Sequence, residues 1–233
     1  MFNLQLIATA SKNEVFNVKK IENIEELYEV LSTSMEHSTW WDTENPWEIV
    51  VGSILVQNTN WKNVAYSLAN IRREIGFSPK RLAEIDQFLL QDLIRPSGFY
   101  KNKSRAIKEI FSWFQRYNYD IGIIQKKEQA ELRKELLAIY GVGYETADVL
   151  MVFVFNKVVF IADKYAQRIF SRLGLNEPLT YLTLQNMIEL PDTFTNEQAQ
   201  NFHGWLVDYG QVHLRSDKDW QAGFLSQFTL VHL

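Results

Sequence analysis

Residues 136–169 read LLAIYGVGYETADVLMVFVFNKVVFIADKYAQRI, and this stretch decides the fold. Apolar residues at helical spacing lead into a Gly-Val-Gly sequence at 141–143 and resume behind it, which predicts two helices joined by a tight hairpin. Asp163 follows twenty residues after Gly143 (163 − 143) and precedes a further helical pattern. The stretch therefore predicts a phosphate grip and a carboxylate on neighbouring segments of backbone.

The hairpin has the residues of an anion-binding turn. Gly141 and Gly143 permit positive φ and close approach of a ligand to the backbone, and Val142 between them is expected to anchor the turn in the core. Free N–H groups and the helix dipole at the start of the second helix favour an anion such as a DNA phosphate. The carbonyl groups of such a hairpin can also hold a monovalent cation. Taken alone, the Gly-Val-Gly sequence favours an ordinary turn between two helices; the aspartate downstream and the motifs described below reverse that preference.

The remainder of the chain is also patterned for helices. Glycine and proline are sparse, at 10 and 5 of 233 residues. Apolar residues recur at helical spacing within 24–31, 47–55, 64–75, 106–114 and 132–139. Helix-capping residues are predicted at Asn45, Ser78, Asp86, Asp163 and Thr195, and a closing glycine at Gly174. Residues 158–162, VVFIA, could be a strand but have no obvious partner. We predict an all-α protein of about ten helices, with no linker.

Composition limits the function without choosing it. The net charge is −4, so any contact with nucleic acid must be local. The absence of cysteine excludes disulfides, thiolate zinc sites and cysteine-bound iron–sulfur clusters, and four histidines argue against a histidine-rich site, so no bound metal is predicted. No apolar run is long enough for a membrane span, and no basic region precedes the short apolar run of residues 1–12, so a cytoplasmic protein is predicted.

Asp163 is the candidate catalytic residue. Breaking an N-glycosidic bond develops positive charge at the sugar C1′, and a carboxylate placed there stabilises that charge and can align or deprotonate water. The alternative is an ordinary helix cap. Lys164 and Arg168, close behind it, could contact phosphates or form a solvated face.

Tryptophans beside polar loops suggest a base-binding pocket. The chain has seven, and Trp40 and Trp41 precede the sequence DTEN while Trp61 follows QNTN. Aromatic walls can sandwich a base rotated out of a duplex, and a cationic base gains further from cation–π attraction. The alternative is that these tryptophans belong to the core.

Two polar clusters could contact DNA. The long amide of Gln57 could fill the gap that a rotated base leaves in a duplex; the alternative is a polar turn. Four cations lie close together beside a Pro-Ser-Gly turn, and could contact the DNA backbone or solvate a helix: Lys101, Lys103, Arg105 and Lys108.

Six segments, in order, resemble those of one enzyme family: WWDTENPWE, GSILVQNTNW, IRPSGFYKNKS, GVGYETAD, ADKYAQRIFSRLG and FHGWLVDYG. From about Trp40 to Gly210 the chain resembles the helix-hairpin-helix DNA glycosylases of the endonuclease III superfamily, most nearly the branch of 3-methyladenine DNA glycosylase III. This resemblance implies two helical lobes on either side of a DNA-binding cleft. One lobe would be residues 44–157 with the hairpin; the other would join 1–43 to 158–233 and carry the catalytic aspartate.

The resemblance also implies residue roles. Asp163 would be the catalytic aspartate and Gln57 the residue inserted into DNA, with Trp40, Trp41 and Trp61 as base-pocket walls. The implied DNA contacts are Gly141, Val142, Gly143, Thr146, Lys101, Lys103, Lys164 and Arg168. The expected partner is damaged double-stranded DNA, and the expected state is a monomer.

Three departures from the family pattern refine the prediction. Bifunctional members have a lysine for imine chemistry where this chain has Glu145, so no lyase step is expected. The four-cysteine iron–sulfur cluster of many members cannot form. Trp205 stands where the FHG segment of the similar branch continues with a pocket lysine, so it could add an aromatic wall, and His203 is expected to structure this segment.

The predicted function is therefore a monofunctional glycosylase for an alkylated, 3-methyladenine-like purine. The alternatives are a glycosylase for another damaged or mismatched base, and a helix-hairpin-helix DNA-binding protein without catalysis.

Overall fold

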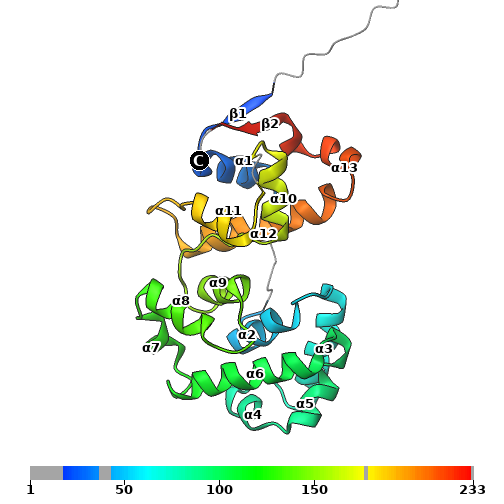
Figure 1. Ribbon diagram of the computed structural model, residues 1–233, viewed down its shortest axis with the longest axis vertical. Helices are drawn as coiled ribbons and strands as arrows, with labels where there is room; N and C mark the ends of the chain where they lie inside the picture. The colour runs from blue at the N-terminus through cyan, green and yellow to red at the C-terminus, as the bar shows by residue number, and fades with distance from the viewer. Residues whose placement is uncertain (1–17, 37–42, 176–177, 232–233) are drawn as a thin grey trace, which may run out of the picture.

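The computed structural model describes residues 18–36, 43–175 and 178–231, which form two stacked helical lobes (Figure 1). The elements are β1 (Lys19–Ile21), α1 (Ile24–Ser34), α2 (Pro46–Leu55), α3 (Trp61–Glu74), α4 (Pro79–Glu84), α5 (Gln87–Leu93), η1 (Arg95–Ser97), α6 (Tyr100–Gln115), α7 (Ile121–Gln125), α8 (Gln129–Leu137), α9 (Tyr144–Phe153), α10 (Lys164–Arg172), α11 (Tyr181–Met187), α12 (Asn196–His213), α13 (Asp217–Ala222), η2 (Phe224–Gln227) and β2 (Phe228–Leu230). The predicted helical fold with a hairpin is confirmed.

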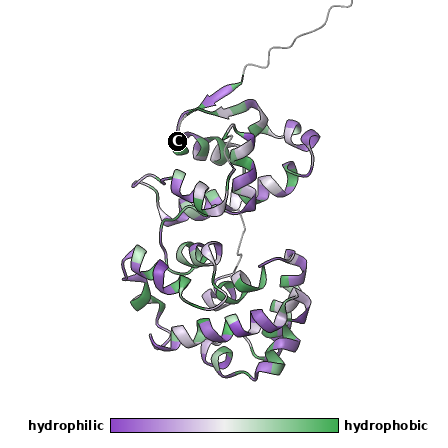
Figure 2. Ribbon diagram, viewed as in Figure 1, coloured by the Kyte–Doolittle hydropathy of each residue, from purple (hydrophilic) through white to green (hydrophobic). Residues whose placement is uncertain are grey.

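Each lobe has its own apolar core. The hairpin lobe is packed around buried residues of α2 to α9, and the second lobe around those of α1 and α10 to α13. In Figure 2 most helices carry both hydrophilic and hydrophobic residues, as amphipathic helices around a core should. Because there are two cores, we propose that residues 44–157 form one domain and that the segments on either side of it form the other.

The extended segment 158–162 passes from one core to the other. Val159 and Ile161 pack into the core of the hairpin lobe, whereas Phe160 and Ala162 pack into that of the second lobe. Alternate side chains of an extended backbone point in opposite directions, which explains the strand-like sequence. No strand forms here, because the segment is buried between two sets of helices rather than paired with another chain segment.

A short parallel pair of strands joins distant parts of the second lobe. Lys19 pairs with Phe228 and Ile21 with Leu230. Three residues a side are too few to give a clear pattern in the sequence, and these strands were not predicted. They bring the start and the end of the described chain together at the far end of the second lobe (Figure 1).

The predicted helix starts are mostly confirmed by their hydrogen bonds. The side chain of Asn45 accepts from the Trp47 amide, and that of Asp86 from the amides of Phe88 and Leu89 in the first turn of α5. Thr195 forms the expected capping box at α12. Gly174 follows α10 with a φ of +114°. Ser78 precedes α4 without a side-chain cap, because Pro79 alone sets the start of that helix.

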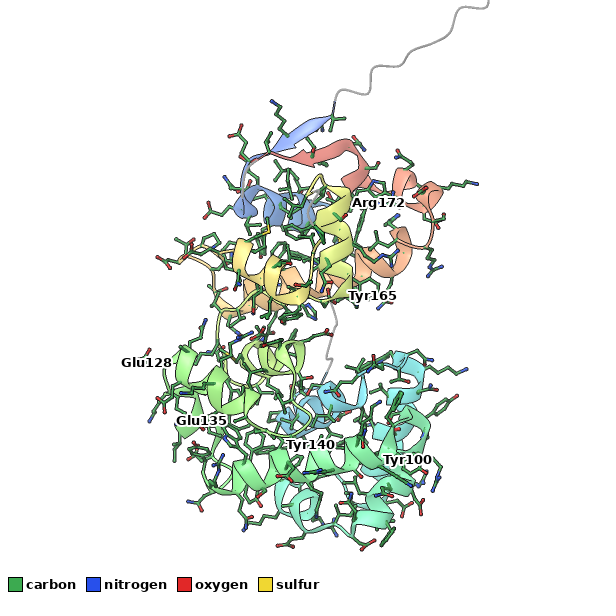
Figure 3. The ribbon with its side chains drawn as sticks, in the orientation of Figure 1. Tyr100, Glu128, Glu135, Tyr140, Tyr165 and Arg172 are labelled. Atoms are coloured by element: carbon green, nitrogen blue, oxygen red, sulfur yellow. The ribbon has the colours of Figure 1, made fainter. Side chains whose placement is uncertain are left out.

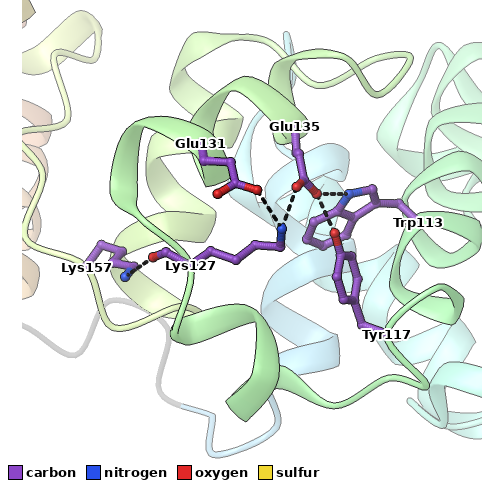
Figure 4. A network of polar contacts seen from close by, with 6 residues as sticks. All are labelled: Trp113, Tyr117, Lys127, Glu131, Glu135 and Lys157. Atoms are coloured by element: carbon purple, nitrogen blue, oxygen red, sulfur yellow. Dashed lines mark hydrogen bonds and ion pairs between the residues drawn. The ribbon is translucent and has the colours of Figure 1, made fainter.

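A polar network fastens α8 to α6 inside the hairpin lobe (Figure 4). One carboxylate oxygen of Glu135 accepts from the indole N–H of Trp113 at 3.1 Å and the hydroxyl of Tyr117 at 2.6 Å, and the other lies 2.7 Å from the Lys127 ammonium. Burial raises the pKa of Glu135, but these hydrogen bonds outweigh it and lower the pKa overall. All three of these bonds to Glu135 lie within the hairpin lobe.

Among residues 18–36, 43–175 and 178–231, no helix has the length and apolar character needed to cross a membrane.

Candidate active site and DNA interface

A cleft of about 590 Å³ lies between the lobes. The hairpin lobe lines it with the loop after α2, the hairpin and the first turns of α9; the second lobe adds the starts of α10 and α11 and part of α12. Six of the predicted site residues line this cleft: Gln57, Gly141, Gly143, Thr146, Asp163 and Lys164. The fold therefore brings the hairpin and the aspartate to one cavity, as the sequence predicts.

Asp163 is both the N-cap of α10 and a buried carboxyl of the cleft. Its Oδ1 accepts from the Ala166 amide at 2.8 Å, and the residue is 6% exposed. Burial raises the pKa of Asp163 to about 7; the nearby Glu145 carboxyl raises it further, while the Ala166 hydrogen bond opposes both. The capping interpretation and the catalytic one are thus compatible. Near neutral pH the carboxyl exchanges between its proton-accepting and its protonated form.

Glu145 is a second carboxyl in this cleft. It lies in the first turn of α9 and reaches solvent in the cleft, yet the surrounding protein is enough to raise its pKa, with Lys164 opposing the shift. The charged residues that line the described part of the cleft are therefore Glu145, Asp163 and Lys164. Two acids against one base favour a positively charged occupant.

Gly141 and Gly143 serve the hairpin in different ways. Gly141 has a φ of +80°, and a Cβ there would lie 2.4 Å from the Cβ of Ala106, so a side chain is excluded by conformation and by space. Gly143 has a φ of −92°, and nothing lies near the position of a Cβ. Gly143 does not use the positive φ that glycine permits; its lack of a side chain leaves open space at the hairpin. Val142 is buried in the core, as predicted.

Gln57 is held against the hairpin. Its Nε2 donates to the Gly141 carbonyl at 3.0 Å and to the Thr146 hydroxyl at 2.9 Å. To enter a duplex the amide would have to leave both partners, which stays a prediction. An anion needs hydrogen-bond donors, and a carbonyl such as that of Gly141 is only an acceptor, so the backbone groups of the hairpin that suit an anion are the amides at the start of α9.

Two of the predicted DNA-binding cations make hydrogen bonds within the fold, Lys103 from a buried position and Arg168 from an exposed one. Lys103 is 3% exposed, and its ammonium donates to the carbonyls of Leu55 at 2.9 Å and Ser97 at 2.7 Å. Burial lowers the pKa of Lys103 to about 8. The Arg168 guanidinium donates to the Leu214 carbonyl at the end of α12. The predicted phosphate contact of Lys103 is therefore wrong for this conformation, whereas Arg168 is exposed and its DNA contact stays a prediction.

Lys101 and Lys164 are exposed, and their DNA contacts stay predictions.

Of the four tryptophans that the sequence suggests as pocket walls, the structure describes two, Trp61 and Trp205. Trp40 and Trp41 lie outside the described residues. Trp61 opens α3 and is 44% exposed, and it is not among the described residues that line the cleft. Trp205 is 5% exposed in the second core, and its indole N–H donates to the Glu36 carbonyl at 2.7 Å. The prediction that Trp205 walls the pocket is wrong, because Trp205 lies on the core-facing side of α12.

His203 lines the cleft from α12, two positions before Trp205. Residues two apart on a helix point to nearly opposite sides, so when Trp205 faces the core His203 faces the cleft. Burial lowers the pKa of His203 to about 4, which keeps the imidazole neutral at pH 7. The ring packs edge-on against Phe153 at 5.9 Å.

Three tyrosines of the cleft were not predicted. Tyr144 and Tyr181 lie with their rings nearly parallel, 6.2 Å between centroids and 17° between planes. Tyr165, labelled in Figure 3 at the end of α10 nearest the hairpin lobe, packs on Gly210. Tyr144 directly follows the hairpin glycine, which could have drawn attention to it. Tyr181 has no local signal, because only the packing of α11 brings it to the cleft.

A helix-hairpin-helix and a buried aspartate that meet in one interlobe cleft define a class of DNA-repair fold. A family model described as "HhH-GPD superfamily base excision DNA repair protein" matches residues 51–190. The chain belongs to this superfamily, and it is a DNA glycosylase of base excision repair. The predicted family is confirmed.

Similar proteins place the chain within the superfamily. A protein of Methanocaldococcus jannaschii named as a DNA repair glycosylase is 35% identical over 193 residues, which cover 82% of this chain and 88% of the relative. Endonuclease III of Sulfolobus acidocaldarius is 29% identical over 178 residues, covering 76% and 77%.

Two solved structures share the fold. The 3-methyladenine DNA glycosylase of H. pylori bound to 1,N6-ethenoadenine has a TM-score of 0.69 at 24% identity, over 81% of this chain and 97% of that one. An endonuclease III–DNA complex has a TM-score of 0.66 at 20% identity, over 83% and 86%.

Proposed function

We propose that the protein is a monofunctional DNA glycosylase that hydrolyses the N-glycosidic bond of a cationic alkylated purine, such as 3-methyladenine, in double-stranded DNA. The observation that carries the proposal is the buried Asp163 carboxyl, which opens onto the same cleft as the hairpin. A phosphate bound at the hairpin amides would place the neighbouring nucleotide between the lobes.

The proposed reaction uses Asp163 as a negative charge beside the sugar. The C1′–N bond breaks, its electron pair stays with the base, and a base that was cationic leaves neutral. Positive charge then develops at C1′, where the Asp163 carboxylate stabilises it. Water adds to C1′ and gives up a proton, for which Asp163 is the nearby acceptor. The product is an abasic site, and no covalent enzyme intermediate forms.

The absence of a lyase step is supported by the residue at position 145. Glu145 cannot form an imine, whereas the lysine that bifunctional family members carry there can. The cleft nevertheless contains one described amine, that of Lys164, next to Asp163. Strand cleavage through Lys164 is therefore the specific alternative that an experiment must separate from simple hydrolysis.

The preference for a cationic base is supported by the charges and rings of the cleft. Glu145 and Asp163 supply two carboxyl groups against the single ammonium of Lys164, and Tyr144 and Tyr181 add aromatic surface. A cationic base is attracted by both features, and it is also a good leaving group. A neutral lesion would gain little from either and would depend more on hydrogen bonds to its edge.

We further propose, from the same resemblance, that Gln57 enters the duplex, that the hairpin holds a monovalent cation together with the phosphate, and that the protein acts as a monomer.

The test is base release from methylated duplex DNA by the native protein, Asp163→Asn and Lys164→Ala. Release of 3-methyladenine by native protein and Lys164→Ala, without strand cleavage or borohydride trapping, would support the proposal. Trapping that disappears in Lys164→Ala would instead show a bifunctional enzyme. If methylated bases stay in place, a panel of oxidised and mismatched duplexes distinguishes a different lesion from a DNA-binding protein without catalysis.

A further inference from the structure

A fully buried carboxylate that the proposed reaction does not use lies one turn behind Glu145. Asp148 of α9 is 0% exposed and receives four hydrogen bonds. Arg133 donates to it through two nitrogens, Nε to Oδ1 at 2.7 Å and a guanidinium NH₂ to Oδ2 at 3.0 Å. The Tyr181 hydroxyl donates to Oδ2 at 2.8 Å, and the Gln185 amide to the same oxygen at 2.5 Å.

This network crosses between the lobes. Arg133 and Asp148 lie on α8 and α9 of the hairpin lobe, whereas Tyr181 and Gln185 lie on α11 of the second lobe. The neighbouring Leu184 of α11 is part of the second core, so α11 moves with that lobe. Arg133 also bonds the Gln185 carbonyl oxygen at 2.8 Å, which closes the network into a ring.

A second set of bonds holds the C-terminal end of α9 to the same lobe. The Asn196 amide of α12 donates to the carbonyls of Val152 at 2.8 Å and Lys157 at 2.7 Å. The hairpin helix is thus fastened to the second lobe at its middle and at its C-terminal end, although its core packing belongs to the hairpin lobe.

We propose that Asp148 is a positioning residue, which locks α9 against α11 and so sets the Asp163 carboxyl in register with the DNA strand gripped by the hairpin. Hairpin and Asp163 belong to different lobes, so their separation depends on contacts between lobes. A buried carboxylate with four donors has one favourable arrangement, and loss of its charge leaves Arg133 without its partner. A displacement of 1 Å at a reacting centre can cost on the order of 100-fold in rate.

The activity test rests on the proposed function and uses Asp148→Asn, which keeps the shape and removes the charge. Excision of 3-methyladenine in a single turnover should fall by at least about 10-fold, because the sugar and Asp163 are out of register. Affinity for DNA that holds a tetrahydrofuran abasic analogue should stay within about 3-fold, because the hairpin amides and Lys164 are unchanged. Tyr181→Phe, which removes one of four donors and keeps the ring, should have a smaller effect.

Glu135→Gln is the matched control. Glu135 also accepts three side-chain hydrogen bonds, but all of them lie within the hairpin lobe (Figure 4). This variant should lose stability as Asp148→Asn does and keep the native excision rate. Equal rate losses in the two variants would show that Asp148 contributes only to stability, and would overturn the proposal.

The pH profile of excision gives a reading that a purely structural role would not change. The titratable groups that line the described part of the cleft around Asp163 are Tyr144, Glu145, Lys164, Tyr165, Tyr181 and His203. Glu145 and burial both raise the pKa of Asp163, and a looser α9 weakens both effects. The midpoint of the profile should therefore move to lower pH in Asp148→Asn and stay in place in Glu135→Gln.

A measurement without DNA separates failure of this inference from failure of the proposed function. The chain has no cysteine, so spin labels can be attached at two introduced ones, Ser112→Cys and Lys218→Cys, at exposed positions in different lobes. The distance distribution should be narrow in native protein and Glu135→Gln, and broad in Asp148→Asn. Broadening without any base release would reject the proposed substrate and retain the lock; a narrow distribution in Asp148→Asn would reject the lock whatever the activity.

Discussion

Asp163→Asn should inactivate the enzyme and make it more stable above neutral pH. Asparagine is a good helix cap, so its side-chain oxygen can still accept from the Ala166 amide. The variant removes the cost of ionising a carboxyl that is 6% exposed. The difference between its ordinary pKa of 3.8 and about 7 in the fold corresponds to about 4 kcal/mol in favour of the protonated form.

The sign follows from proton binding. Between pH 4 and 7 the folded protein holds a proton on Asp163 that the unfolded chain has lost, so this group lowers stability as pH rises through that window. Above about pH 7 the full cost is present in the native protein and absent from Asp163→Asn. The variant should therefore be more stable at pH 8 by up to about 4 kcal/mol, and the difference should vanish near pH 4.

Urea unfolding followed by tryptophan fluorescence, at pH 8 and at pH 4, measures the difference. Base release by the native protein over the same range should rise with pH through about 7, because the carboxylate is the reactive form. If Asp163→Asn is no more stable than the native protein at pH 8, the buried carboxyl is not strained, and the argument for its raised pKa is refuted.

Three further predictions concern the two hairpin glycines, the buried Lys103, and Trp205. Gly141→Ala should destabilise by at least about 1 kcal/mol because of its positive φ and the clash with α6, whereas Gly143→Ala should unfold at nearly the native urea concentration. Lys103→Met should change the free energy of unfolding and leave the salt dependence of DNA binding as it is, because the Lys103 ammonium bonds two carbonyls of the fold. Lys101→Ala should reduce the slope with which DNA affinity falls as salt increases. The reverse pattern in binding titrations would restore Lys103 as a phosphate contact. Trp205→Phe should retain the ratio of 3-methyladenine to 7-methylguanine release, and a changed ratio would return Trp205 to the pocket.

Local signals in the sequence predicted the hairpin, the aspartate and most helix starts. Gly141, Asp163 and Thr195 act through hydrogen bonds and backbone angles within a few residues, so their roles can be inferred without the fold. The same rules do not give the short parallel strands, which pair residues from opposite ends of the described chain.

Lys103 and Tyr181 show two different reasons for failure. Lys103 lies at helical spacing from Ala106, Ile107 and Ile110, all of them buried, so periodicity could have placed it on the core-facing side of α6. Tyr181 reaches the cleft because α11 packs beside α9, and no neighbouring residue in the sequence indicates that contact. Trp205 belongs to the first kind, since its spacing from Phe202, Leu206 and Tyr209 marks the buried side of α12.

The pairing of β1 with β2 sets the order in which the two lobes can fold during synthesis on the ribosome. The hairpin lobe is one continuous stretch of chain and can fold as soon as it has emerged. The second lobe needs both Ile21 and Leu230, so its core is completed only after Leu230 has emerged, which is well after the hairpin. In a nascent chain the hairpin can therefore be folded well before the residues that surround the Asp163 carboxyl and raise its pKa are in place. Catalytic activity is the last property that the folding chain acquires.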